Sequence, residues 1–249
     1  MSYKISCVSY LNSKPFIYGI ENTEMLHRGE IELSLDIPSR CAEKLMKKEA
    51  DIGLVPIATL PLLDDYQIIS KYCIGAIGAV HSVSLYSDVP LASIESIILD
   101  YQSLTSVNLT RILCKNYWNI SPQFIPASKD YINDISGTRA GVIIGDRTFQ
   151  LQDRYRYTYD LSEEWMKFTK LPFVFAVWVS TVQLEQEFIQ AFEEALGFGL
   201  NNIAQVSKMY AEQYKPYDVQ KYLSHYISYS FDEKKEKALH LYLELLKNL

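Results

Sequence analysis

Hydrophobic and polar residues follow short, regular patterns along the first third of the chain. Residues 31–37 place apolar side chains at every second position, which is typical of a strand with one buried face. Apolar runs at 4–8 and 51–56 predict two further strands, and helices are predicted at 14–21 and 38–50. Strands that alternate with helices in this way favour a mainly parallel sheet with right-handed crossovers.

A second series of the same kind begins near residue 80. Its predicted strands and strand–loop–helix segment are 80–87, 96–118, 123–127 and 140–149. An apolar strand at 171–180 follows, and residues 184–206 and the segment from Asp232 onward carry apolar side chains at helical spacing. Gly197 and Gly199 are expected to kink the first of these helices or to permit close packing.

No linker rich in Pro or Gly separates the two series, so we expect one lobe to be inserted into the other. Residues 1–83 and 178–249 would form the first lobe, and residues 84–177 the second. The chain would cross between the lobes near 80–86 and 174–180. Two lobes connected in this way would close around a ligand in a central cleft.

Composition excludes several classes of protein. With 249 residues, 48% hydrophobic and 13% aromatic, the chain can bury a large core, and disorder is excluded. The net charge of −6 and the scattered Lys and Arg residues argue against a nucleic-acid partner. No apolar run approaches membrane-spanning length, and no export signal is recognised at the start. We therefore expect a cytoplasmic protein, whose oligomeric state the sequence leaves open.

Cysteine and histidine spacing argues against metal sites and disulfides. The four cysteines are far apart with no C-x-x-C pair, and the four histidines are equally dispersed. We expect reduced, mostly buried thiols and no metal.

A polar cluster follows the first predicted strand. In VSYLNSKPF, Asn12 and Ser13 precede Pro15, which suits the first turn of a helix. In open α/β sheets this junction, at the carboxyl edge of the strands, is where small ligands bind. The alternative is that Asn12 or Ser13 only caps the helix.

A second polar cluster lies between Asp100 and the helix predicted after it. The hydroxyl groups of Ser103, Thr105 and Ser106 stand where a helix begins, and exposed N–H groups at a helix start attract a carboxylate or phosphate. One of these hydroxyls would suffice as a cap, so anion binding and capping both stay open. No Gly-rich loop is present, which argues against a nucleoside triphosphate.

Two further segments offer candidate chemistry. Asp146 can orient a ligand hydroxyl or accept a proton, and Arg147 can bind a carboxylate, or the two can pair and fix their own loop. His81 is a possible general base beside Ser82. We favour a structural or surface role for His81, because neighbours on an alternating strand face opposite sides.

Six segments together resemble the chorismate dehydratase family of the futalosine route to menaquinone. They are, in order, VSYLNSKPF, IPSRCAEKLMKKEADIGLVPIATL, IGAVHSVSLYS, LDYQSLTSVNLTRIL, GVIIGDRTF and YDLSEEWMKFTKLPFVFAVW. The resemblance implies an α/β, two-lobed relative of type II periplasmic binding proteins, with mixed, mainly parallel sheets, flanking helices and a central cleft. It also implies loss of water from chorismate to give 3-enolpyruvylbenzoate, without metal or organic cofactor.

The same resemblance implies roles for individual residues. Asn12 would donate a hydrogen bond beside the ring, and Ser82 would orient or protonate the leaving hydroxyl. The other substrate-binding positions would be Ser39, Thr105, Ser106, Ile144, Gly145 and Asp146. The proton acceptor would be a carboxylate of the substrate itself or Asp146. Two alternatives stay open: a binding or sensor protein for a small carboxylate, because the same fold serves both classes, and a sister enzyme of the same pathway.

Overall fold

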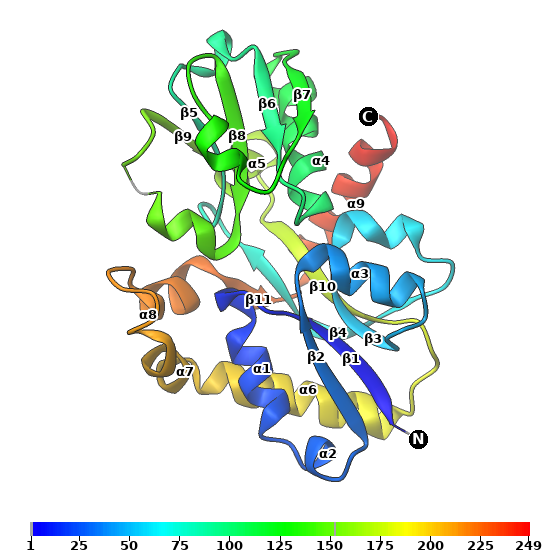
Figure 1. Cartoon of the computed structure of the whole chain (residues 1–249). Coiled ribbons are helices and arrows are strands. Elements are labelled where there is room, and N and C mark those ends of the chain that lie inside the picture. The colour runs from blue at the N-terminus through cyan, green and yellow to red at the C-terminus, as the bar shows by residue number, and fades with distance from the viewer. Residues whose placement is uncertain (1, 152) are drawn as a thin grey trace. The chain divides into compact units, whose positions relative to one another are not determined.

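The computed structural model describes residues 2–151 and 153–249 as two compact α/β units, each with its own sheet (Figure 1). Unit 1 extends to Gly75 and resumes at Val174–Asp232. Unit 2 comprises Ala76–Phe173 and Glu233–Leu249. Four of the six strands of the unit 1 sheet precede the first crossing, whereas all five strands of the unit 2 sheet lie between Ala76 and Phe173.

This division differs from the expected one at the C-terminal end. Helix α9 (Glu233–Lys247) belongs to unit 2, which corrects the expected assignment of residues 233–249 to the first lobe. The hydroxyl of Tyr242 on α9 donates to the Thr105 carbonyl at 3.0 Å, and its ring packs edge-on against Trp165 and Phe173. An apolar helical stripe predicts burial but does not specify which surface covers it.

The sheet of unit 1 has six strands in the order β11-β4-β10-β3-β1-β2. The strands are β1 (Tyr3–Val8), β2 (Ile31–Asp36), β3 (Ile52–Pro56), β4 (Gln67–Ala76), β10 (Phe173–Ser180) and β11 (Ser228–Ser230). β1 pairs in parallel with both β2 and β3, as the alternating pattern predicted, whereas β10 runs antiparallel to β3. β4 and β11, which the sequence analysis did not identify, pair antiparallel at the far edge.

Within the described residues, six α-helices belong to unit 1. They are α1 (Lys14–Glu21), α2 (Glu24–His27), α3 (Pro38–Met46), α6 (Gln186–Asn201), α7 (Ile203–Tyr210) and α8 (Val219–Lys221). α1 matches the predicted helix at both ends. The predicted helix at 184–206 is divided near Asn202 into α6 and α7.

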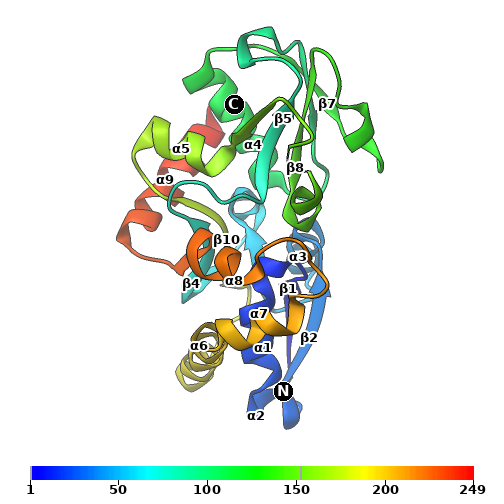
Figure 2. The same cartoon turned by 90° about the vertical axis from the view of Figure 1, so that its left-hand side faces the viewer.

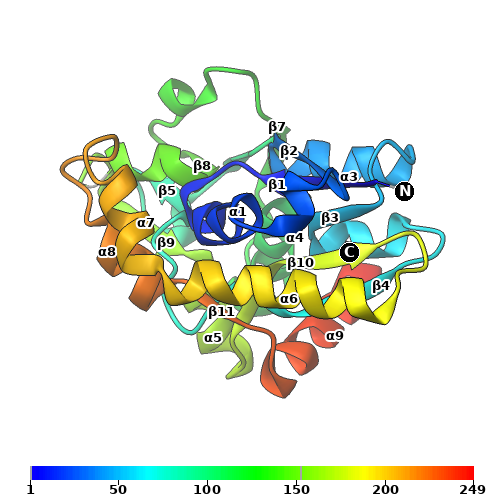
Figure 3. The ribbon, with the colours of Figure 1, turned by 90° about the horizontal axis from the view of Figure 1, so that it is seen from below.

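Helices α1 and α6 lie side by side with their backbones in contact (Figure 3). A Cβ atom on Gly199 would lie 1.8 Å from the Pro15 carbonyl oxygen, and one on Gly19 would lie 2.0 Å from the Ala195 carbonyl oxygen. Only glycine fits at such a distance. Because α6 runs uninterrupted through Gly197 and Gly199, the close-packing interpretation of this pair holds at Gly199 and the kink does not occur.

The sheet of unit 2 has five strands in the order β7-β6-β8-β5-β9. They are β5 (Val83–Ser87), β6 (Ser96–Leu99), β7 (Gln123–Pro126), β8 (Arg139–Ile144) and β9 (Tyr157–Asp160). β6 is parallel to β7 and β8, whereas β5 is antiparallel to β8 and β9. Helices α4 (Leu104–Leu113), α5 (Leu161–Thr169) and α9 lie on one side of this sheet (Figure 2).

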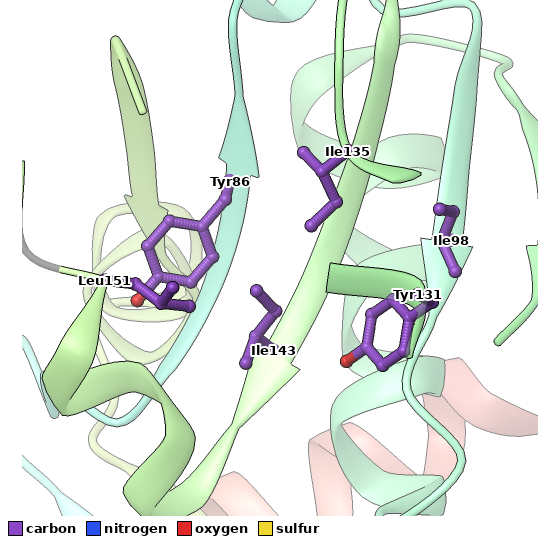
Figure 4. Packing of buried hydrophobic residues seen from close by; sticks show 6 residues of the cluster. All are labelled: Tyr86, Ile98, Tyr131, Ile135, Ile143 and Leu151. Atoms are coloured by element: carbon purple, nitrogen blue, oxygen red, sulfur yellow. The ribbon is translucent and has the colours of Figure 1, made fainter. Parts of the chain in front are cut away.

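A separate group of buried side chains covers the other face of the unit 2 sheet (Figure 4). Its members are Tyr86, Ile98, Tyr131, Ile135, Ile143 and Leu151. Tyr131 is a polar member of this group, and its hydroxyl reaches the edge of the sheet at which the candidate site lies.

Candidate functional site

The carboxyl ends of three parallel strands meet at one edge of the unit 1 sheet. Asn12 lies in the 3-10 turn Leu11–Ser13 after β1, and Ser39 lies in the first turn of α3 after β2. Because β1 and β2 are parallel neighbours, both half-buried residues belong to the same sheet edge. The structure therefore brings together these two candidates within unit 1.

Asn12 is oriented by its neighbour rather than by a capping role. Ser13 occupies the N-cap position of α1 but makes no side-chain capping bond; its hydroxyl donates to Asn12 Oδ1 at 3.1 Å. The hydroxyl of Tyr229 donates to the Asn12 carbonyl at 3.0 Å. Neither Asn12 nor Ser13 therefore caps the helix, and within the described residues Asn12 Nδ2 has no hydrogen-bond acceptor. That amide is available as a donor.

A cluster of polar side chains at the end of β2 links α3 to the sheet. Asp36 Oδ2, at the end of β2, accepts hydrogen bonds from Ser6 Oγ at 2.8 Å and Ser34 Oγ at 3.1 Å, and forms an ion pair with Lys44 Nζ at 2.5 Å. Burial alone would raise the pKa of Asp36, but the bonds from Lys44 and the two serines outweigh it and lower that pKa below its usual value. The cluster is fully paired, and we assign it a structural role.

In unit 2, Ser82 and the turn after β8 lie next to each other. β5 begins at Val83 and pairs antiparallel with β8, so the residue before β5 lies beside the residues that follow Ile144. The Gly145 N–H donates to the Ser82 carbonyl at 2.8 Å, and Gly145 has a φ of +67°, which glycine adopts without strain. Ser82, Ile144, Gly145 and Asp146 thus form one group.

Asp160 holds the turn that precedes Ser82. Its Oδ1 atom caps α5 by accepting from the Ser162 and Glu163 N–H groups, and its Oδ2 atom accepts from the Val80 and His81 N–H groups at 2.9 and 2.7 Å. One carboxylate therefore joins the start of α5 to the turn before Ser82.

His81 precedes the strand instead of lying in it. It is exposed and has a φ of +63°, and β5 starts at Val83, so the strand-alternation argument does not apply to His81 and Ser82. Its backbone takes part in the turn through its N–H bond to Asp160 and its carbonyl, which accepts from Thr148 at 3.3 Å. The geometry supports a structural role for the backbone of His81.

The start of α4 contains the second predicted polar cluster. Ser103 is the cap: its Oγ accepts from the Ser106 N–H at 3.3 Å and lies 3.2 Å from Ser106 Oγ. Thr105 and Ser106 are almost fully buried in the first turn of this ten-residue helix. Ser103 supplies the cap, so the hydroxyls of Thr105 and Ser106 are not needed for that purpose.

The principal residue that sequence reasoning missed is Asp100. Its carboxylate is buried and forms an ion pair with Arg147 Nη2 at 2.5 Å. An ion pair between Asp100 and Arg147 therefore fixes this loop. A signal was present in the sequence, because an apolar strand that ends in Asp places a carboxylate at the edge where the next parallel strand also ends.

The cysteine thiols lie in the interior. All four cysteines are free and buried, as expected, and burial raises the pKa of Cys41 and of Cys114 to about 12. Neither thiol ionises appreciably at neutral pH. In the part of the chain that the structure describes, no three His, Cys, Asp or Glu side chains lie close enough together to hold a metal ion. None of the described helices combines the length and apolarity required to cross a membrane.

Comparison with known proteins gives a consistent result. A family model described as menaquinone biosynthesis matches residues 3–248. A chorismate dehydratase from Thermus thermophilus is 25% identical over 268 residues, covering 98% of this chain and 95% of that protein. A protein of known structure from Archaeoglobus fulgidus has a TM-score of 0.74 at 16% identity, with 99% of this chain and 97% of that chain covered.

A second solved structure identifies the type of fold. The Candida albicans CA3427 gene product, described as having the generic periplasmic binding protein fold, has a TM-score of 0.73 at 13% identity, covering 100% of this chain and 91% of that chain. The α/β, periplasmic-binding-protein-like architecture predicted from the sequence is confirmed. With a family model that spans nearly the whole chain, the protein belongs to the menaquinone biosynthesis family.

Proposed function

We propose that the protein is a chorismate dehydratase, which converts chorismate to 3-enolpyruvylbenzoate. The observation that carries the proposal is the family match over residues 3–248, together with a relative of that name aligned along 98% of the chain. Neutral hydrogen-bond donors at the sheet edge of each unit, taken separately, support it, because the substrate is a dianion that neutral donors can bind.

The chemistry requires little of the protein. A ring carbon loses its hydroxyl group and the neighbouring carbon loses a hydrogen as a proton; a new ring double bond forms and the ring becomes aromatic. The hydroxide that leaves is protonated to water, so no oxidant or reductant is consumed. Aromatisation supplies the driving force, and the enzyme needs to hold two carboxylates and assist the departing hydroxyl.

We assign the roles as follows. Asn12 donates from Nδ2 beside the ring, and Ser82 orients or protonates the leaving hydroxyl. The first turn of α4 binds one carboxylate through Thr105 and Ser106, aided by the positive end of the helix. The remaining substrate contacts are the side chain of Ser39 and the backbone of Ile144, Gly145 and Asp146.

The proton acceptor in this proposal is a carboxylate of the substrate. Asp146, half-buried at the turn after β8, is the protein side chain that could replace it. Substitution Asp146→Asn distinguishes the two: activity is retained if the substrate accepts the proton, whereas loss of a general base lowers kcat by about 10²- to 10⁴-fold.

The test is incubation of the purified protein with chorismate, followed by absorbance and mass of the product. Asn12→Ala and Ser82→Ala are expected to lower kcat by about 10²- to 10³-fold, because each removes a preorganised contact to the reacting group. Asn22→Ala, at the end of α1, and Ser87→Ala, buried at the far end of β5, are matched controls. Their rates should stay close to the wild-type rate.

A small-carboxylate binding protein is the competing function, because the solved structures of similar fold include a periplasmic aliphatic sulphonate binding protein. Such a protein would bind chorismate and return it unchanged. Full activity in both Asn12→Ala and Ser82→Ala would contradict the residue roles while leaving the reaction in place.

A further inference from the structure

Asp100 accepts hydrogen bonds from two separate loops of unit 2. Its Oδ1 atom accepts from the Gln102 N–H at 2.8 Å, at the start of the loop that leads into α4. Its Oδ2 atom accepts from the Ile144 N–H at 3.2 Å, at the end of β8, and from Arg147 at 2.5 Å. One buried carboxylate therefore joins the segment before Thr105 and Ser106 to the turn at Gly145.

The buried side chain of Tyr131 also contacts the Asp100 carboxylate. Its hydroxyl lies 2.7 Å from Asp100 Oδ2 and 2.6 Å from the Val142 carbonyl, and the residue is almost fully buried. Burial and the neighbouring Asp100 charge raise the pKa of Tyr131, so the hydroxyl stays protonated and can donate. Through Tyr131, the Asp100 carboxylate, which we call the hub, is linked to β8 and to the apolar group shown in Figure 4.

Arg147 neutralises the buried charge. Its side chain is 27% exposed, whereas that of Asp100 is 0% exposed, and the guanidinium lies 5.8 Å from the centroid of the Tyr101 ring. An unpaired carboxylate at this position would oppose any anion bound at the start of α4, because like charges repel strongly where water is excluded. The ion pair removes that repulsion.

We propose that Asp100 is a positioning residue that couples the α4 loop to the turn after β8, with Arg147 as the counter-ion that makes the coupling compatible with a bound carboxylate. The proposal rests on the function proposed above for the α4 loop and this turn. Arg147 acts through Asp100 and not by binding the substrate itself.

An asparagine cannot reproduce this role. The carboxylate presents acceptors to both loops, whereas an amide presents one oxygen and one NH₂ group. In Asp100→Asn the NH₂ group must face the N–H of either Gln102 or Ile144, so one loop is released. Side-chain volume hardly changes, which makes the variant a test of hydrogen bonding and not of packing.

The coupling is measured first without any ligand, by amide hydrogen exchange. In Asp100→Asn we expect the amide of Gln102 or Ile144 to exchange about tenfold faster than in the wild type, since one buried bond is lost. Amides at the opposite end of β8 should be unaffected. Unchanged exchange at both Gln102 and Ile144 would overturn the coupling, whatever the protein's activity.

The kinetic test separates positioning from charge. Asp100→Asn should lower kcat about tenfold or more while KM changes by less than about threefold. Arg147→Met leaves Asp100 unpaired and should raise KM for chorismate about tenfold. In the double variant Asp100→Asn/Arg147→Met, KM should return to within about threefold of the Asp100→Asn value, with kcat still low. A KM that stays high in the double variant would show that Arg147 binds the substrate directly.

A milder pair of variants covers the possibility that Asp100→Asn does not fold. Tyr131→Phe removes one hydroxyl bond to Asp100; Tyr155→Phe removes a hydroxyl bond of 2.8 Å to the Ile132 carbonyl in the same region. Tyr131→Phe should lower kcat several-fold, with Tyr155→Phe unchanged at comparable Tm. Equal effects on kcat in the two variants would contradict a positioning role for Asp100, because they would show only a general loss of stability. Absence of chorismate turnover by the wild type would contradict the proposed function, and the exchange measurement would still decide the coupling.

Discussion

At the scale of single residues, the polar side chains near the strand ends differ in how many of their atoms have hydrogen-bond partners. Asp36, Asp100 and Asp160 each accept hydrogen bonds from several groups and connect elements within their own unit. Asn12, by contrast, has its Oδ1 atom fixed by Ser13 and its Nδ2 atom directed to no acceptor among the described residues. A side chain held on one side and available on the other suits recognition of a small molecule.

Asp36 provides a prediction for stability against pH. Its pKa is lower in the folded protein than in the unfolded chain, so its contribution to stability is complete above the unfolded value near pH 4 and is lost as pH falls through the folded value. Asp36→Asn should therefore lower Tm at pH 7 and lower it less at pH 3.

Thermal unfolding of both proteins between pH 7 and pH 3 measures this difference. Glu24→Gln, which removes an exposed ion pair with Arg28, is the control and should show little effect at either pH. A Tm difference for Asp36→Asn that is as large at pH 3 as at pH 7 would contradict the assignment.

The positions of single residues were predicted correctly where they depend only on neighbouring residues in the sequence. The sequence places Asn12, Ser103 and Gly145 correctly after strand ends because each junction is read from neighbouring residues. It missed the Asp100–Arg147 pair, since the partners are 47 positions apart and belong to different strand ends. Only the pairing of β6 with β8 brings them together.

At the scale of elements, most strands and helices with a clear apolar pattern were predicted, whereas β4, β9 and β11 were not. β11 and β9 consist of three and four residues and are defined by their partners β4 and β5 instead of by a pattern of their own. The break between α6 and α7 was missed for the opposite reason, because apolar spacing continues across it.

The contact between α1 and α6 gives a prediction at this scale. Gly199→Ala places a methyl group on the Pro15 carbonyl, which backbone movement alone can relieve, and should destabilise the protein by about 1–3 kcal/mol or more. Gly197→Ala, on the same helix, meets the Tyr72 hydroxyl at 3.0 Å, and that side chain can move. Ala also has the higher helix propensity, so this variant should be close to neutral.

Urea unfolding of the two glycine variants makes the comparison, with activity as a second readout. Equal stability of the Gly199→Ala and Gly197→Ala proteins would contradict the close-packed geometry of α1 and α6.

At the scale of the whole molecule, two α/β units were predicted and two are present, but the number of connections differs. The chain passes between units at Gly75–Ala76, Phe173–Val174 and Asp232–Glu233, whereas two crossings were expected. The third crossing returns α9 to unit 2, where Tyr242 packs against Trp165. Sequence periodicity carries no information about which unit a terminal helix joins.

Solved structures of similar fold include a periplasmic aliphatic sulphonate binding protein from Escherichia coli, so the fold alone does not distinguish an enzyme from a binding protein. In the function that we propose, the distinction depends on chemistry at the side chains of Asn12 and Ser82. Our account assigns the reaction to these groups and to the aromatisation of the substrate, with no metal involved.

The most direct test of this central claim is the mass of the product formed from chorismate by protein dialysed extensively against EDTA. The account predicts a product lighter than chorismate by one water, formed over many turnovers at the rate of the undialysed protein. Recovery of unchanged chorismate from untreated and dialysed protein alike, or activity that disappears on dialysis and returns with added metal, would contradict it.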